Sequence, residues 1–120
     1  RKDAVFNLQR VGLLLAALQS GRTELLAEAM RDRIHQPYRA PLIPGLAEIL
    51  SLTNVTGLLA AALSGAGPSV LAVCEPIDNS SAAAQDGPAA AIQECFARHG
   101  VKSCARRVPV DRQGIIIDKS

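Results

Sequence analysis

Apolar residues follow a helical pattern in the first half of the chain. Residues 3–20 are rich in leucine and have the length of one helix, which Gly21 ends as a C′ glycine. Because the apolar positions cover most of its circumference, we expect this helix to be largely buried. Thr23 is suited to cap a second helix. The apolar stripe of that helix contains Leu25, Leu26, Ala29, Met30 and Ile34.

Prolines interrupt the helical pattern after this stripe. Residues 35–44 contain Pro37, Pro41 and Pro44, which we expect to stop the second helix and to enforce an extended loop. A short helix is then predicted from Pro44 or Gly45 to about residue 52. The first half of the chain is therefore expected to hold three helices.

The second half changes to short apolar runs. Residues 58–63 and 70–74 indicate buried strands, and residues 75–87 a loop with helical character at its alanines. Pro88 is typical of the first turn of a helix, here running to Arg98 with Gly100 as its C′ residue. Two more strands are predicted at 102–110 and 114–117. The order predicts one α+β domain over residues 1–120, a small antiparallel sheet with helices packed on one face.

The loop between the first two strands is rich in glycine. Gly65 and Gly67 permit positive φ angles and leave the backbone bare, so its N–H groups could face an anion or brace a neighbouring phosphate loop. No Lys-Ser/Thr pair follows, which excludes a Walker P-loop, and the third glycine of a dinucleotide fingerprint is missing. We expect Ser64 and Ser69 to bond the turn backbone rather than to act as nucleophiles.

Composition narrows the class of partner. A net charge of +2 gives no strong field toward DNA or membranes, and an aromatic share of 2% argues against stacking on single-stranded nucleic acid. No apolar run is long enough to span a bilayer. Cys74, Cys95 and Cys104 are expected to be buried free thiols in a reducing compartment. The chain begins with Arg1 inside a predicted helix, which suggests a segment of a longer protein.

Two arginines are candidate anion-binding groups. Asp3, Asn7 and Arg10 share one stripe of the first helix, so Arg10 either grips a ligand carboxylate or phosphate or pairs with Asp3. Arg39 lies in the proline-stiffened loop, which would hold it in place for an anionic substrate, or it is a solvated surface residue. For His35 we expect a helix C-terminal cap.

Three segments in this order resemble the C-terminal half of bacterial homoserine kinases, which belong to the GHMP kinase superfamily. They are Asp3–Arg10 (DAVFNLQR), His35–Arg39 (HQPYR) and Leu63–Ser69 (LSGAGPS). The resemblance runs from Asp3 to about Val110, and its most particular part is the segment from His35 through Gly45. It implies a ferredoxin-like GHMP kinase C-terminal domain. Residues 75–87 depart from the family pattern because they are longer and richer in alanine.

The resemblance also implies a function. The complete enzyme would transfer the γ-phosphoryl group of ATP to the hydroxyl of L-homoserine, giving O-phospho-L-homoserine, a cytoplasmic step toward threonine. Arg10, Arg39 and Asn7 would bind the substrate, and ATP and Mg²⁺ would be held mainly by an N-terminal domain outside this chain. The residues expected to brace the phosphate loop of that domain are Ser64, Gly65, Ala66, Gly67, Pro68 and Ser69. No catalytic base and no metal ligand can be assigned, and the fragment alone is expected to be inactive.

Other readings of the same residues stay open. The chain could belong to another GHMP kinase that acts on a different small alcohol, or it could be a non-catalytic α+β ligand-binding module. The expected partners are L-homoserine, ATP and the N-terminal domain, with a homodimer as one assembly and with neither nucleic acid nor a membrane.

Overall fold

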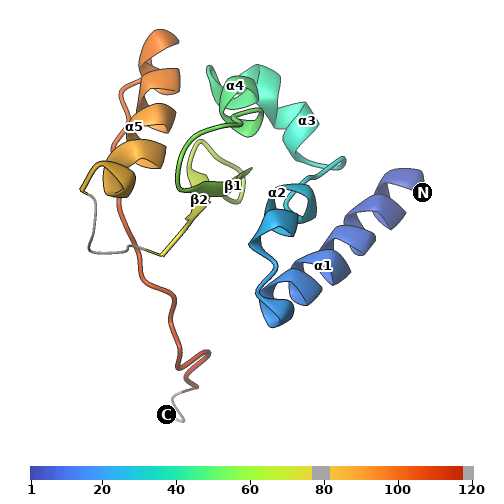
Figure 1. Ribbon diagram of the computed structural model, residues 1–120. Coiled ribbons are helices and arrows are strands. Elements are labelled where there is room, and N and C mark those ends of the chain that lie inside the picture. Colours follow the sequence, from blue (N-terminus) through green and yellow to red (C-terminus); the bar gives the residue numbers. More distant parts are fainter. Residues whose placement is uncertain (77–81, 118–120) are drawn as a thin grey trace.

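The computed structural model describes residues 1–76 and 82–117, and Figure 1 shows its arrangement. The secondary structure of the described part consists of helices and a single hairpin, in line with the expected α+β class. The elements in chain order are α1 (Lys2–Ser20), η1 (Thr23–Leu25), α2 (Leu26–Ala29), α3 (Gln36–Arg39), η2 (Ala40–Leu42), α4 (Leu46–Leu50), β1 (Leu58–Leu63), β2 (Val70–Cys74) and α5 (Ala82–Arg98).

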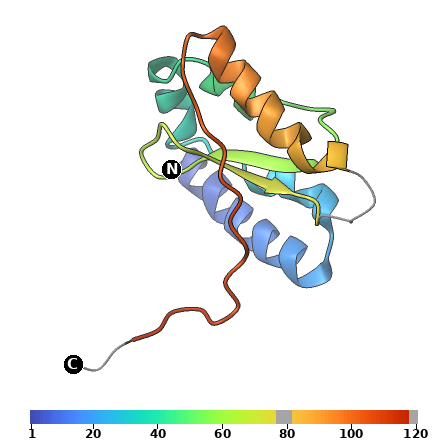
Figure 2. The same ribbon diagram turned by 90° about the vertical axis from the view of Figure 1, so that its left-hand side faces the viewer.

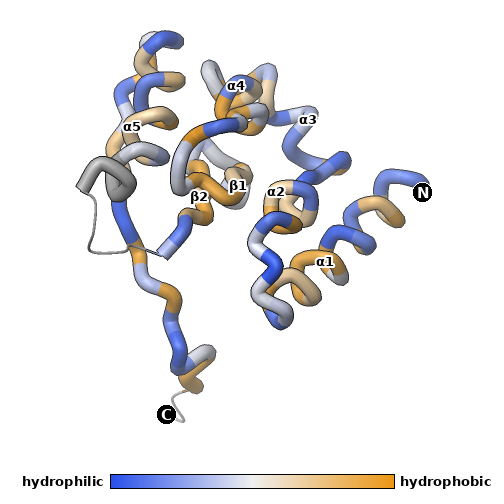
Figure 3. The backbone as a smooth tube through the Cα atoms, viewed as in Figure 1, coloured by the Kyte–Doolittle hydropathy of each residue, from blue (hydrophilic) through white to orange (hydrophobic). Residues whose placement is uncertain are grey.

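Helix α1 ends as predicted but is far more exposed than expected. Gly21 has a φ of 69° and donates its backbone N–H to the carbonyl of Ala17, so it is the C-terminal cap. Ala17 is the one fully buried residue of the helix. The side of α1 that no described residue covers carries Val5, Leu8, Val11, Leu15 and Leu18, which are 51–72% exposed. We name these five residues the outer face of α1, and Figure 3 shows that the second half of the helix is mostly hydrophobic.

The segment after α1 is helical in short pieces. Thr23 opens the 3₁₀ turn η1 and makes no side-chain cap, and α2 ends at Ala29, so Ile34 lies outside the helix and is 50% exposed. The expected extended loop over residues 35–44 is also wrong, because α3 and η2 occupy residues 36–42. Pro37 and Pro41 sit in the first positions of these turns, where a missing N–H costs no helical hydrogen bond. The prolines therefore start turns here instead of preventing them.

The hairpin lies between two groups of helices. Strand β1 pairs with β2 in antiparallel register, from Leu63 opposite Val70 to Leu58 opposite Cys74, with an irregularity near Ala60. Ala60 packs with α1 and α2, whereas its neighbour Ala61 packs with α4 and α5. The α+β class is confirmed, but helices cover both faces, as Figure 2 shows, because both strands are apolar on both sides.

The C-terminal part differs most from expectation. Helix α5 begins at Ala82, so the helical character expected at the alanines is confirmed. The helix also continues through residues 85–87, where a loop was expected, and Pro88 lies inside it instead of in its first turn, while residues 77–81 lie outside the described part. Residues 102–117 form no strand. They leave the body of the molecule in Figures 1 and 2, and Ile115 is 92% exposed. A strand needs a hydrogen-bonded neighbour, and no described segment pairs with this one.

Two smaller expectations concern cysteines and membranes. Cys95 is buried between α4 and α5, but Cys74 and Cys104 are exposed, so the expectation of three buried thiols holds for one of them. Within residues 1–76 and 82–117, no helix combines the length and the hydropathy needed to cross a bilayer.

Candidate functional site

The glycine loop, residues 63–69, is a tight turn whose backbone is partly used within the loop itself. Gly65 and Gly67 have φ angles of 58° and 82°, which glycine adopts without steric cost. The Ser64 amide donates to the carbonyl of Ser69 at 2.8 Å, and the Gly67 amide donates to the carbonyl of Ser64 at 3.1 Å. The serines thus bond the turn through their backbones, and no hydroxyl bond of either is found among the described residues. The loop is a braced turn rather than an open cradle.

Gly67 also touches the proline-containing segment. A Cβ atom at this position would lie 2.6 Å from Cδ1 of Ile43 and 2.9 Å from Cδ1 of Leu63, so the site has no room for a side chain. A Cβ atom at Gly65 would meet nothing within 4 Å. The two glycines are therefore required for different reasons, conformation at Gly65 and both conformation and space at Gly67.

A second contact to the loop comes from residues 32–36, which we name the Asp32 turn. His35 donates Nε2–H to the carbonyl of Gly65 at 3.0 Å. The Gln36 side chain accepts a hydrogen bond from the Leu63 amide at 2.8 Å and donates one to the carbonyl of Met30 at 3.4 Å. His35 is therefore not the helix C-terminal cap that its position suggested. Its ring lies against the glycine loop instead.

Asp32 organises this turn. Its carboxylate accepts the backbone N–H groups of Ile34, His35 and Gln36 at 2.9, 2.7 and 2.5 Å, and the side-chain amide of Asn7 at 2.5 Å. Partial burial raises the pKa of Asp32, but the hydrogen bonds from Asn7 and from the three backbone amides outweigh it and lower the pKa to about 2. The side chain is thus a carboxylate at any physiological pH.

Asn7 links α1 to the same turn. Besides donating to Asp32, its side-chain carbonyl accepts the backbone N–H of Arg33 at 3.0 Å. Both polar atoms of this amide therefore bond the Asp32 turn. The structure brings Asn7 to the segment that carries Arg39, but through Asp32 and Arg33 rather than through a direct contact.

Arg10 lies in a cluster of cations around Phe6. Its guanidinium is 4.2 Å from the centre of the Phe6 ring, and that of Arg33 is 4.0 Å away, distances typical of cation–π contacts. Arg10 also forms an ion pair with Glu28 on α2 at 3.1 Å, rather than with Asp3. Its Nε atom is buried and has no hydrogen-bond partner among the described residues.

Glu28 serves two of these arginines. It pairs with Arg31 at 3.0 Å as well as with Arg10, and the hydrogen bond from Arg31 is the main cause that lowers the pKa of Glu28. Arg31 is itself 5.9 Å from the Phe6 ring centre. Three guanidinium groups thus surround Phe6 with one carboxylate paired to them, which leaves a positive surface beside Asn7 that favours anions.

Arg39 ends the helix that the Asp32 turn starts. Its backbone amide donates to the carbonyl of His35 at 3.2 Å, which fixes it relative to the turn. Its side chain is half-buried and forms no hydrogen bond or ion pair with the described residues. The guanidinium is therefore held on an ordered element, and its hydrogen-bonding capacity is unused by the described part of the chain.

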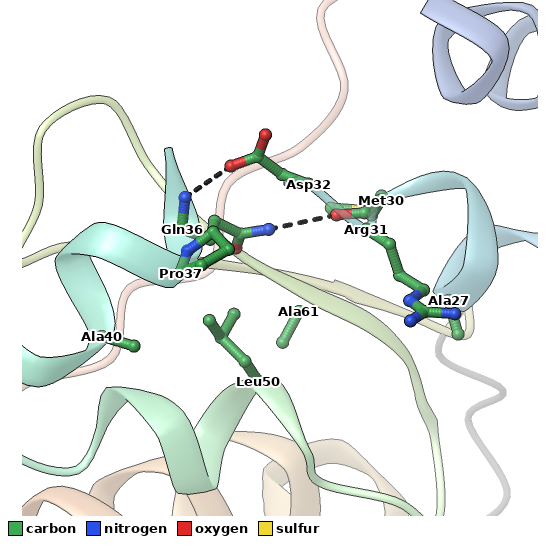
Figure 4. A pocket seen from close by; sticks show the side chains of 9 residues that line it. All are labelled: Ala27, Met30, Arg31, Asp32, Gln36, Pro37, Ala40, Leu50 and Ala61. Atoms are coloured by element: carbon green, nitrogen blue, oxygen red, sulfur yellow. Dashed lines mark hydrogen bonds between the residues drawn. The ribbon is translucent and has the colours of Figure 1, made fainter. Parts of the chain in front are cut away.

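A cavity of about 200 Å³ lies beneath the Asp32 turn. Figure 4 shows Gln36 and Asp32 on one side, with Leu50 and Ala61 across from Gln36. None of the three predicted substrate-binding residues, Asn7, Arg10 and Arg39, lines it. The side chains of Asp32 and Gln36 are already hydrogen-bonded to other groups of the chain.

Sequence reasoning missed Asp32 and Gln36 and assigned a different role to His35. An aspartate whose side chain can bond backbone amides two to four residues later is a recognised turn signal, and Asp32 stands before such a segment. Gln36 offers no comparable signal, because its partner Leu63 is 27 residues away in sequence.

The sequence and the structure of this chain are both similar to those of known proteins. Residues 14–102 match the protein family described as "GHMP kinases C terminal". A homoserine kinase from Moorella thermoacetica is 42% identical over 116 residues, which are 97% of this chain and 37% of that protein. A homoserine kinase from Solibacter usitatus is 59% identical over 75 residues, 62% of this chain and 24% of the relative.

A solved structure is similar as well. The crystal structure of homoserine kinase from Cytophaga hutchinsonii superposes with a TM-score of 0.65 at 31% identity, covering 81% of this chain and 29% of that one. The chain thus spans little more than a third of the length of the curated relatives that it matches along nearly its whole extent. With its helices, its glycine-loop hairpin and a family match over residues 14–102, this chain belongs to the C-terminal domain family of the GHMP kinases.

Proposed function

We propose that the full-length protein containing this chain phosphorylates the side-chain hydroxyl of L-homoserine with ATP, as a cytoplasmic step toward threonine. In this reaction the hydroxyl oxygen forms a bond to the γ-phosphorus of ATP, the bond from that phosphorus to the β–γ bridging oxygen breaks, and ADP leaves. The hydroxyl proton is released, and O-phospho-L-homoserine is the product. The present chain supplies the acceptor-binding side and supports the phosphate loop.

One observation carries the proposal: the three segments that resemble homoserine kinases form one hydrogen-bonded unit. Asn7 bonds the Asp32 turn, and the Asp32 turn bonds the glycine loop through His35 and Gln36. Relatives named homoserine kinase, including one at 42% identity over 97% of the chain, support the same substrate. Positioning of this kind is the main task of the protein in phosphoryl transfer.

The proposed contacts to the substrate carboxylate are Arg39 and Arg10. Arg39 is favoured as the main contact because its guanidinium is uncommitted within the described part of the chain and can bind a carboxylate in bidentate fashion. Arg10 adds positive potential from the cluster around Phe6, although Glu28 already pairs with it. Asn7 is reassigned from a substrate contact to a residue that holds the Asp32 turn.

ATP and Mg²⁺ are assigned to the part of the protein outside this chain. Among the described residues, no three His, Cys, Asp or Glu side chains lie close enough together to hold a metal ion. No Mg²⁺ site is therefore assigned to the described residues. The glycine loop, through Ser64 to Ser69, is proposed to brace the phosphate loop of the partner domain.

We assign the outer face of α1 to contact with the remainder of the same polypeptide. The five apolar side chains of that face are 51–72% exposed here, an apolar surface of the kind that marks an interface. Relatives that match nearly all of this chain are longer by more than half of their own length, so a further domain exists in them to cover such a face. A homodimer would use the same face in a concentration-dependent way.

The test measures ADP release by the full-length protein with homoserine, mevalonate and a sugar as acceptors. Homoserine is expected to be preferred, and Arg39→Ala is expected to raise the KM for homoserine at least about tenfold, since a charge-assisted bond contributes roughly 1.5–3 kcal/mol. Arg22→Ala is the matched control, because Arg22 is an exposed arginine that pairs with Glu24 two residues away. An unchanged KM in Arg39→Ala would remove Arg39 from the substrate site.

The panel also separates the other candidate functions. Preference for mevalonate or a sugar would assign the protein to another GHMP kinase activity. No ADP release with any acceptor would favour a non-catalytic ligand-binding module.

A further inference from the structure

The Asp32 turn contacts the glycine loop at two separate points. His35 donates to the carbonyl of Gly65 inside the loop, at 3.0 Å, and Gln36 accepts the amide of Leu63 where β1 enters the loop, at 2.8 Å. Two bonds to different residues fix both the position and the orientation of a short loop.

The same turn is anchored on its other side. Asp32 accepts three consecutive backbone amides within the turn, so its carboxylate sets the backbone path on which His35 and Gln36 stand. Asn7 bonds both Asp32 and the backbone of Arg33, which ties this path to α1. The order of contacts is therefore α1, Asp32 turn, glycine loop.

The turn also leads directly into α3, which carries Arg39. The amides of Tyr38 and Arg39 both donate to the carbonyl of His35 at 3.2 Å. The backbone of His35 thus supports the arginine while its ring holds the loop. One residue connects the two halves of the candidate site.

We propose that His35 and Gln36, set in place by Asp32, are positioning residues that hold the glycine loop at a fixed position relative to Arg39 on α3. The inference rests on the proposed function, because the position of the loop relative to Arg39 matters only if an acceptor bound near Arg39 must meet a phosphoryl group near the loop. In this proposal His35 and Gln36 act through the loop and contact neither the acceptor nor ATP. Their loss therefore lowers kcat more than it raises the KM for the acceptor, and a misplacement of about 1 Å can cost on the order of 100-fold in rate.

Gln36 gives the sharpest test, because two substitutions separate its shape from its hydrogen bond. Gln36→Met keeps the length of the side chain but removes the acceptor for the Leu63 amide, whereas Gln36→Glu keeps an acceptor oxygen. Gln93→Met is the matched control, because it makes the same chemical change at another half-buried glutamine. Gln93 lies on α5 and donates to the carbonyl of Ser103, away from the glycine loop.

The first measurement is hydrogen exchange of the Leu63 amide in the full-length protein, with no substrate present. Gln36→Met is expected to speed this exchange about fivefold to tenfold, the factor that corresponds to one net hydrogen bond. Gln36→Glu and Gln93→Met should leave the exchange close to that of the wild type. If Gln36→Met exchanges at the wild-type rate, the bond to the loop does not hold it and the proposal is overturned.

The second measurement is steady-state kinetics with whichever acceptor the wild type prefers. Gln36→Met is expected to lower kcat at least about tenfold with a smaller change in the acceptor KM, and Gln36→Glu should recover most of the loss. Likewise, His35→Leu should lower kcat, and His35→Gln, which retains a donor for Gly65, should restore it. A loop that exchanges faster in Gln36→Met while kcat stays at the wild-type value would also overturn the proposal.

These outcomes are distinct from failure of the proposed function. If the wild type prefers an acceptor other than homoserine, the kinetic comparison still applies to that acceptor. If it phosphorylates none, the position of the loop relative to Arg39 has no catalytic use. The proposal then falls with the function, even where hydrogen exchange of the Leu63 amide shows that the bond holds the loop.

Discussion

Replacing Gly67 with alanine tests whether the glycine loop and the proline-containing segment fit together as the structure indicates. The added Cβ atom would lie 2.6 Å from Cδ1 of Ile43 and 2.9 Å from Cδ1 of Leu63, both closer than real Cβ contacts come. The backbone at Gly67 also has a φ of 82°, where a residue with a Cβ atom is strained. Gly65→Ala is a natural control, since its φ is 58° but its Cβ would meet nothing within 4 Å.

The expected magnitudes differ accordingly. Alanine in the left-handed region costs about 1–2 kcal/mol, and the loss of chain entropy in the unfolded state returns about 0.4–1 kcal/mol, so Gly65→Ala should cost about 0.5–1 kcal/mol. Gly67→Ala adds the cost of overpacking, about 1–3 kcal/mol, for a total of about 2–4 kcal/mol. The difference between the two variants is the energy of the steric contact.

Urea unfolding of the full-length protein measures both values. A third variant, Ile43→Val, removes the Cδ1 atom that lies nearest to the new Cβ, and it should recover about 1 kcal/mol when combined with Gly67→Ala. Recovery is partial, because the contact with Leu63 remains. Equal destabilisation by Gly65→Ala and Gly67→Ala, or no coupling between residues 43 and 67, would refute the reasoning.

Two further predictions concern Asp32 and the outer face of α1. The pKa of Asp32 is lowered from 3.8 to about 2 on folding, so its contribution to stability is fully present above pH 3.8 and is lost as the pH falls through about 2. A shift of this size corresponds to roughly 2.5 kcal/mol, which we reduce to about 1 kcal/mol because the side chain is only partly buried. Asp32→Asn should therefore be less stable than the wild type at pH 6, with a gap that narrows toward pH 2, and a constant gap in acid-unfolding curves would contradict the assignment. On α1, Leu8→Lys combined with Leu15→Lys should destabilise the full-length protein by several degrees if another domain covers this face, whereas truly exposed sites change stability by no more than about 0.5 kcal/mol. A melting temperature that is unchanged would show the face to be open, and a shift that depends on protein concentration would assign it to a second copy.

Local signals predicted the elements whose structure depends on neighbouring residues. The end of α1 at Gly21 and the two strands around the glycine loop follow from cap chemistry and short apolar runs, and both are confirmed. The prolines misled the prediction, since Pro37 and Pro41 stand at the starts of short helical turns, where proline is tolerated as readily as in an extended loop. Proline alone does not distinguish these two environments.

Elements that depend on distant partners were predicted less well. The apolar runs at 102–110 and 114–117 have strand composition, but they pair with neither strand of the described hairpin, so composition was insufficient. In the same way, the circumference of α1 correctly indicated an apolar helix but could not say which side this chain itself would bury.

The candidate site shows the same division. The resemblance to homoserine kinases located the three segments of the candidate site. Asn7 bonds the Asp32 turn, and His35 of that turn bonds the glycine loop. It could not find that Asp32 and Gln36 make the joining bonds, since these depend on pairs separated by 25 and 27 residues. Arg10 and Arg39 as substrate contacts stay predictions.

The alanines of β1 make the middle layer of the domain thin, and neighbouring alanines face different groups of helices. Ala60 packs with α1 and α2, whereas Ala61 packs with α4 and α5. Enlarging Ala60 would push outward α2 and α1, which carries Arg10, and enlarging Ala61 would displace α4 and α5. Substitutions in one strand can thus adjust the spacing of the two helix groups in small steps, without altering Arg10 or Arg39.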